Sequence, residues 1–255
     1  MAFGSQIAPT FNDVTIDVGA PEQVISAKAA RKGGGFGSIF SPPDADVVDI
    51  QSVRTRGSMS VITGADADRV FMTKFAIGSA PNGHNGDLVI NTGSGADNVT
   101  LQTSAGSTIS NVFGKLSITT YSNINENHRD EVYLETLLAL KDVEVKTGGG
   151  GDVIHMSGVV SNKKVDITAG AGDDSVTLRR TQSVDGLFAR MGEGNDTSLV
   201  DTVWGNATLL GEAGSDSLTV SNLKGSTNVS TGWEWINGRR VFDIYQPPIG
   251  PVVVY

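Results

Sequence analysis

Apolar residues recur at fixed offsets from a series of Asp residues along most of this chain. The second and fourth residues after each Asp are apolar in fifteen of sixteen cases, where a composition that is 38% hydrophobic predicts about six. The residues between them are mostly polar, and a period of two predicts strands with one buried face. The sixteen positions are Val48, Ile50, Val70, Met72, Val99, Leu101, Val132, Leu134, Ile154, Met156, Val176, Leu178, Ser198, Val200, Leu218 and Val220.

A longer period organises these strands. The series consists of Asp46, Asp68, Asp97, Asp130, Asp152, Asp174, Asp196 and Asp216, and the successive differences in residue number are 22, 29, 33, 22, 22, 22 and 20. Five of the seven intervals describe one unit, and the other two are the same unit with insertions. A unit of this length suits one coil of a solenoid, whose neighbours stack about 4.8 Å apart. We therefore expect an all-β, right-handed, single-stranded parallel β-helix of about eight coils with N- and C-terminal caps, roughly 40 Å long.

The pattern also predicts the ends of the rod. Residues 1–40 form an N-terminal strand around Val14–Val18 and a helix-like capping segment from Pro21 to Ala30. Residues 41–225 form the coils, and residues 226–255 form a C-terminal cap and an extended tail, all in one structural domain. The stretch from Glu131 to Leu140 is rich in Leu and Glu, but its apolar residues fall on the common offsets, which predicts a strand. Trp233 and Trp235 are expected to cover the last coil, with contact to a sugar or a partner as the alternative.

Composition narrows the functional classes. The net charge of −9 argues against a nucleic acid partner, because non-specific binding to phosphates needs clustered Lys and Arg. The chain has no Cys, so it has no disulfide, zinc-thiolate site or cysteine nucleophile. Asp and Gly are both abundant, which indicates many tight turns.

Membrane and export signals are absent from the pattern. No apolar run is long enough to span a bilayer, and the segment 1–30 lacks a basic region followed by an apolar one. We expect an extracellular or cell-surface protein whose export signal is not part of this sequence.

A glycine-rich turn leads into most units. It reads Gly-x-Gly-x-Asp in the four copies that end at Asp97, Asp152, Asp174 and Asp196, and degenerate copies precede the other four Asp residues. Gly supplies positive φ in such corners, and the Asp carboxylate can accept hydrogen bonds from the backbone of its own turn. In the simplest interpretation, each carboxylate accepts hydrogen bonds from the backbone of its own turn, and these turns lie along one edge of the rod.

Over about half of the chain, this theme resembles the calcium-binding repeats of hemolysin-type (RTX-like) proteins. The resemblance implies Ca²⁺ shared between the turns of neighbouring coils, since Ca²⁺ takes six to eight oxygen ligands. The residues that it nominates as metal ligands are Asp97, Asp152, Asp174, Asp196 and Asp216, with Asp68 as a weaker candidate. The motif recurs here once per expected coil, a much longer spacing than the nonapeptide of that family, so calcium would follow a single edge.

Electrostatics leaves the calcium and structural interpretations open. Two carboxylates stacked about 4.8 Å apart repel by roughly 0.9 kcal/mol in water and several-fold more in a less polar environment. A row of ionised Asp therefore needs cations, full solvation or hydrogen-bond donors in every turn.

The outward strand positions offer a candidate for catalysis. Glu135, His155 and Arg179 fall on exposed positions of neighbouring strands, where they would suit calcium-assisted proton abstraction beside a uronate. Scattered Thr residues also raise the possibility of an ice-binding face, but the column that holds them is interrupted. We expect a non-enzymatic structural or adhesive repeat protein whose partner is a polysaccharide or another cell-surface component, with a polysaccharide lyase or hydrolase acting on an acidic glycan as the alternative.

Overall fold

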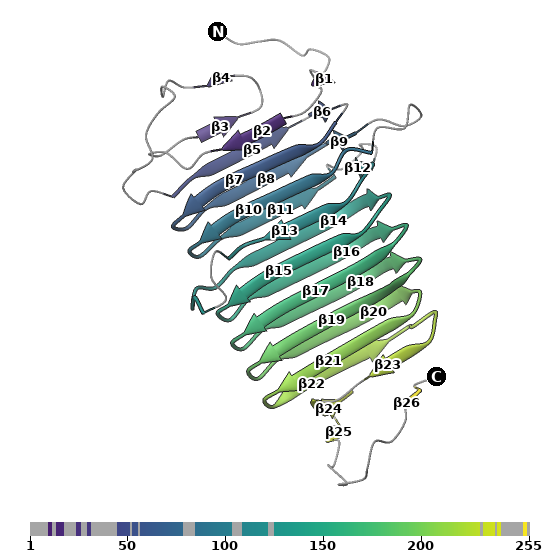
Figure 1. Cartoon of the computed structure of the whole chain (residues 1–255). Coiled ribbons are helices and arrows are strands. Elements are labelled where there is room, and N and C mark those ends of the chain that lie inside the picture. Colours follow the sequence, from purple (N-terminus) through teal and green to yellow (C-terminus); the bar gives the residue numbers. More distant parts are fainter. Residues whose placement is uncertain are drawn as a thin grey trace.

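The computed structural model describes residues 45–51, 53–55, 57–78, 85–103, 109–121, 125–229 and 232–237, together with short strands nearer both ends. These residues form a parallel β-helix, with two sheets facing each other across a continuous core (Figure 1). Each sheet adds its strands in chain order, because every coil contributes to one sheet and then to the other. The β-helix expected from the sequence is confirmed.

The first sheet, sheet A, begins directly after each corner Asp. Its strands are β3 (Val24–Ser26), β4 (Ala30–Arg31), β5 (Val47–Gln51), β8 (Arg69–Thr73), β11 (Asn98–Gln102), β14 (Glu131–Ala139), β16 (Val153–Ser161), β18 (Ser175–Ser183), β20 (Thr197–Trp204), β22 (Asp216–Ser221), β24 (Trp233–Ile236) and β25 (Arg239–Arg240), with β1 (Thr10–Phe11), β6 (Arg54–Thr55), β9 (Ala76–Ile77) and β12 (Ser110–Val112) alongside. The strand predicted from Glu131 is therefore confirmed as β14.

The second sheet, sheet B, returns the chain to the Asp corner. Its strands are β2 (Val14–Asp17), β7 (Met59–Ala65), β10 (Leu88–Ser94), β13 (Leu116–Thr119), β15 (Val143–Gly149), β17 (Lys164–Ala171), β19 (Gly186–Glu193), β21 (Ala207–Ala213), β23 (Thr227–Val229) and β26 (Val252–Val253).

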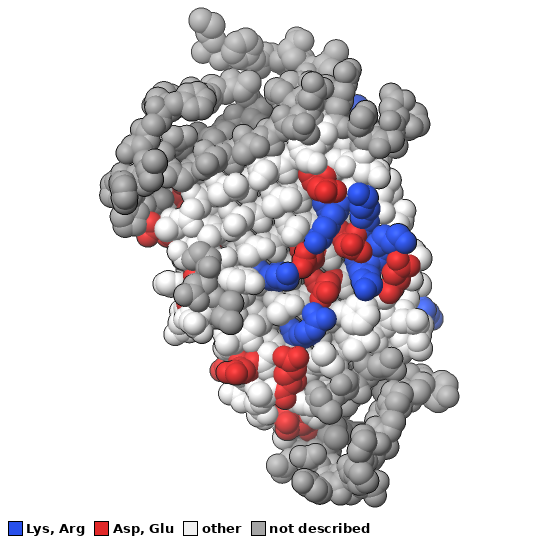
Figure 2. Space-filling view, in the orientation of Figure 1, with Lys and Arg blue, Asp and Glu red and all other residues white. Residues whose placement is uncertain are grey.

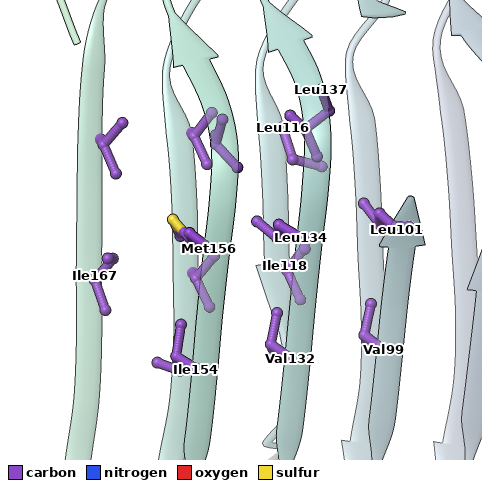
Figure 3. Close-up of a cluster of buried hydrophobic side chains, with 14 of the residues drawn as sticks. Val99, Leu101, Leu116, Ile118, Val132, Leu134, Leu137, Ile154, Met156 and Ile167 are labelled. Carbon is purple, nitrogen blue, oxygen red and sulfur yellow. The ribbon is translucent and has the colours of Figure 1, made fainter. Parts of the chain in front are cut away.

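Residues at equal offsets from successive Asp residues are the ones that pair between neighbouring strands. Val132 lies opposite Ile154, and Leu134 lies opposite Met156. Because equivalent residues stack directly, the apolar side chains form continuous columns between the two sheets (Figure 3). These four side chains are fully buried. The one polar member of the sixteen, Ser198, is buried as well.

A bend divides the longer strands of sheet A. The sixth residue after the corner Asp has positive φ in six coils, at Lys74, Thr136, Gly158, Arg180, Thr202 and Asn222. In β14 the alternation of burial breaks at Glu135 and Thr136, both exposed, and resumes at Leu137. These six coils therefore turn at three places, and in them the outer side of sheet A is flat only up to this bend.

The N-terminal segment departs from one prediction. The expected strand around Val14 is confirmed, since β2 pairs in parallel with β7. The helix expected from Pro21 to Ala30 is wrong, because Val24–Ser26 is a strand that pairs with β5 and then with β4. β-Branched Val24 and Ile25 suit a strand that covers the open edge of the first coil better than they suit a helix. The C-terminal tail beyond 240 lies outside the described residues except for β26.

Of the two Trp residues expected to cover the last coil, Trp233 alone is buried. Trp233 is 5% exposed, and its indole nitrogen donates to the carbonyl oxygen of Leu209 at 3.1 Å. Trp235 is 41% exposed. Across the described residues, no helix has the length and apolar character that crossing a bilayer requires.

Candidate functional site

The repeated glycines of the Asp corner are required by the stacking of the coils. Gly170 and Gly192 have φ values of 124° and 110°. A Cβ atom on either would lie 1.6 Å from the carbonyl oxygen of the equivalent Gly in the preceding coil. A Cβ on Gly172 or Gly194, the second glycine of the motif, would lie within 2.0 Å of the carbonyl oxygen of the preceding coil. Both glycine positions thus permit backbone to approach backbone between coils.

The corner Asp residues join the coils in one continuous row. The backbone N–H of each Asp donates to a carboxyl oxygen of the equivalent Asp in the next coil, as from Asp152 to Asp174 at 2.8 Å. The same bond, at 2.8 to 2.9 Å, links the whole series from Asp46 to Asp216. At the end of the row, Glu234 stands in place of a further Asp, and its carboxylate accepts a hydrogen bond from the N–H of Asp216 at 2.6 Å. We call these eight Asp residues the Asp row.

This bonding differs from the sequence-based interpretation. Each carboxyl group was expected to tie its own turn, but it receives its hydrogen bond from the coil before it. The separation of 22 residues between Asp152 and Asp174 is one full coil, so the carboxyl joins neighbouring coils. The row also lies inside the rod, since none of its members is more than 3% exposed.

Burial changes the acidity of the row. Loss of solvent raises the pKa of Asp97 to about 7, that of Asp130 and Asp174 to about 8, and that of Asp196 to about 6. The pKa values of Asp68, Asp152 and Asp216 are raised for the same reason. The backbone N–H bonds lower these pKa values, but by less than burial raises them. At neutral pH the carboxyls of Asp130 and Asp174 therefore favour the protonated, uncharged form, whereas that of Asp196 favours the ionised form above about pH 6.

The second carboxyl oxygen is consistent with a bound proton. In Asp68, Asp97, Asp152, Asp174, Asp196 and Asp216 it is buried and has no hydrogen-bond partner as an acceptor. Protonation makes this oxygen a donor. Near Asp152 lies the hydroxyl of Thr147, which lowers the pKa of that carboxyl and itself donates to the carbonyl oxygen of Ala169 at 2.9 Å.

The buried row does not fit the calcium shell that the family resemblance implies. One oxygen of each carboxyl faces an N–H donor, whose positive end opposes a cation. Within the described ranges, no group of three or more Asp, Glu or His residues is placed to hold a metal ion. Ca²⁺ takes six to eight oxygen ligands, which requires several carboxyls to converge on one point. Calcium binding by the chain stays a prediction from the resemblance alone.

The residues nominated for catalysis share the outer face of sheet A. Glu135 and Arg179 occupy the same column, but Ser157 lies between them in register, so they are about 10 Å apart. His155 belongs to the neighbouring column, where its ring lies 6.1 Å from that of Tyr133. The structure thus places all three on one face without bringing them into contact.

A groove crosses this face one strand earlier. It has a volume of about 540 Å³ and is lined by Arg69, Asn98, Thr100, Gln102, Tyr133 and Glu135. β11, which contributes Asn98, Thr100 and Gln102, lies between β8, which contributes Arg69, and β14, which contributes Tyr133 and Glu135. Of these six residues, only Glu135 was nominated from the sequence. The groove is lined by residues of three stacked strands from three coils, a combination that no sequence motif records.

The outer side of sheet B carries charges of both signs. Glu144 on β15 is bonded by Lys115 and Lys146, which hold the pKa of its carboxyl at about 2, and Arg190 bonds Asp166 at 2.8 Å. Figure 2 shows acidic and basic side chains interleaved in one band on the face it displays. Charges that neutralise each other locally do not form a basic surface for a polyanion.

Comparison with known proteins adds no assignment: no family model, no curated protein and no solved structure matches the chain.

Proposed function

We propose that this chain is a non-enzymatic, exported or cell-surface β-helical protein, which serves as a rigid structural or adhesive rod. The observation that carries the proposal is the Asp row. The Asp carboxyls are the most regularly repeated chemical groups of the sequence, and the fold uses them to join one coil to the next. Seven bonds between Asp residues, and an eighth to Glu234, run through the described coils. The glycines of the motif are likewise used for close stacking.

The location can be tested in the cells that make the protein. Fractionation followed by detection with an antibody is expected to find the chain in the medium or at the cell surface, where added protease removes it from intact cells. Recovery in the cytosol alone, protected from the protease, would overturn the proposal.

The lyase alternative stays a prediction. It needs a base and a cation beside the same sugar carbon, and Ser157 separates Glu135 from Arg179 in their column. Uronate polymers incubated with the protein, with and without Ca²⁺, would show a rise in ultraviolet absorbance if an unsaturated product formed. We expect no rise.

A further inference from the structure

The groove over β8, β11 and β14 has unused hydrogen-bonding groups on both sides. The guanidinium of Arg69 and the carboxylate of Glu135 make no ion pair or side-chain hydrogen bond to any described residue. The amide of Gln102 is equally free of side-chain partners among them. Guanidinium, carboxylate and amide groups each offer two positions side by side, which suits bidentate bonding.

An aromatic ring completes the lining. Tyr133 is half-buried on β14, directly opposite Thr100 of the groove. Its ring is tilted by 38° against the ring of His155 in the next coil, which supports it from outside the groove. The phenol pKa is raised by burial and by the neighbouring Glu131, with which the hydroxyl also forms a hydrogen bond, so the hydroxyl stays protonated. The ring face is therefore what Tyr133 offers to the groove.

These groups match the chemistry of a sugar. Neighbouring hydroxyls of a sugar ring are both donors and acceptors, so they pair with amide, guanidinium and carboxylate groups that lie side by side. The C–H face of the ring packs on an aromatic side chain. The groove spans two strand spacings, about 10 Å, which accommodates a short segment of a glycan chain.

The charges select among glycans. Arg69 is the one cation in the lining, and Glu135 is also part of it. Glu131 stands beside the groove and accepts from the amide of Asn98 at 3.2 Å, while Arg129 lies 3.2 Å from its carboxylate. Arg69 and Glu135 balance each other in the lining, and Arg129 pairs with Glu131, so the groove has no net positive charge to attract a uronate or sulfated chain. A neutral glycan needs no such charge.

We propose that this groove binds a neutral glycan, which makes the rod adhesive toward a carbohydrate surface. The inference rests on the adhesive part of the proposed function. It assigns the site to Arg69, Gln102, Tyr133 and Glu135, with Asn98 and Thr100 in the same lining.

The test is a glycan array that carries neutral and anionic oligosaccharides, probed with the wild-type protein and three variants. Tyr133→Ala and Gln102→Ala change the groove, and Thr177→Ala changes the same outer face on β18, outside it. Thermal melting of each variant confirms that the fold is retained. We expect the wild type and Thr177→Ala to bind at least one neutral glycan, and each groove variant to bind it at least tenfold more weakly.

Three results would overturn the inference: no neutral glycan retained, anionic glycans retained alone, or equal binding by wild type and groove variants. A failure here would leave the cell-surface location untouched, because fractionation and protease treatment measure it independently.

Discussion

Two different environments surround the carboxyl oxygens of six Asp residues in the row: Asp68, Asp97, Asp152, Asp174, Asp196 and Asp216. One oxygen accepts an N–H from the coil before it, and the other is buried without a hydrogen-bond partner. In Asp130 the second oxygen accepts from the hydroxyl of Thr120 at 2.5 Å. An ionised carboxylate in that position would lose solvation and stand about 4.8 Å from the next one. The residue best suited to it is an acid that keeps its proton at neutral pH, which the raised pKa values describe.

This environment sets the pH dependence of stability. The folded-state pKa of Asp174 is about 8, above its ordinary value of 3.8, so the native state retains a proton that the unfolded chain releases. Its contribution to stability is complete below about pH 4 and is lost as pH rises through 8. As pH rises within that window, the unfolding free energy falls by about 1.4 kcal/mol per pH unit for each proton that the native state retains and the unfolded chain releases. We predict that the protein loses stability from pH 5 to pH 8 in urea titrations.

Asp174→Asn tests the assignment of this slope. The Asn carbonyl can still accept the N–H of Asp152, and its amide stays neutral at every pH. The unfolding free energy of the variant minus that of the wild type is expected to increase by at least about 1 kcal/mol when the pH is raised from 5 to 8. Asp201→Asn is the control, because hydrogen bonds from Asn222 and Ser221 lower the pKa of Asp201 and place its titration below this range. A wild-type slope of zero, or equal slopes for Asp174→Asn and wild type, would contradict the assignment.

The corner glycines give a second prediction at this scale. Gly170→Ala places a Cβ atom 1.6 Å from a carbonyl oxygen at a φ of 124°, and we expect a loss of at least about 3 kcal/mol of stability. Gly158→Ala is the matched control. At Gly158 φ is 68°, the nearest atom would be 3.4 Å away, and other coils carry Thr or Arg there, so the expected cost is about 1 kcal/mol. Chemical denaturation measures both, and equal costs would show that stacking does not require the glycine.

At the scale of the element, strands were predictable wherever their own residues fix the pattern. The segment that holds Val132, Leu134 and Leu137 has a helix-like composition, yet it forms a strand. Its apolar residues stand at the same offsets as those of the next coil and stack on them. The segment around Val24 misled for the opposite reason. Its strand depends on pairing with β5, a contact that no local pattern shows.

The last coil tests how an element end is protected. Trp233→Ala removes a buried ring and the bond to Leu209, and we expect a loss of about 3 to 5 kcal/mol in unfolding free energy. The same change at Trp235, which is 41% exposed, is expected to cost about 1 kcal/mol or less. Denaturant titration of the two variants decides the point. Similar losses would mean that Trp233 does not close the core.

At the scale of the whole molecule, the same spacing that revealed the rod also concealed the role of its acids. The regular interval between the Asp residues predicted which of them stack, yet it carried no information on whether they face solvent or the interior. The structure places eight of the acidic residues inside, so the formal charge of −9 overstates the charge of the folded chain near neutral pH. The groove was equally hidden, because its lining combines residues of three coils, among them Arg69, Asn98 and Tyr133.

Hydrogen bonds from backbone N–H groups to the carboxyls of the Asp row hold the coils together. Thermal unfolding at constant pH, after exhaustive treatment with EDTA and again with excess Ca²⁺, tests this most directly. We expect the same midpoint in both conditions, since the donors of the row are backbone N–H groups. A midpoint that rises with Ca²⁺ and falls with EDTA would contradict this expectation, because a ligand that binds the native state alone must stabilise that state.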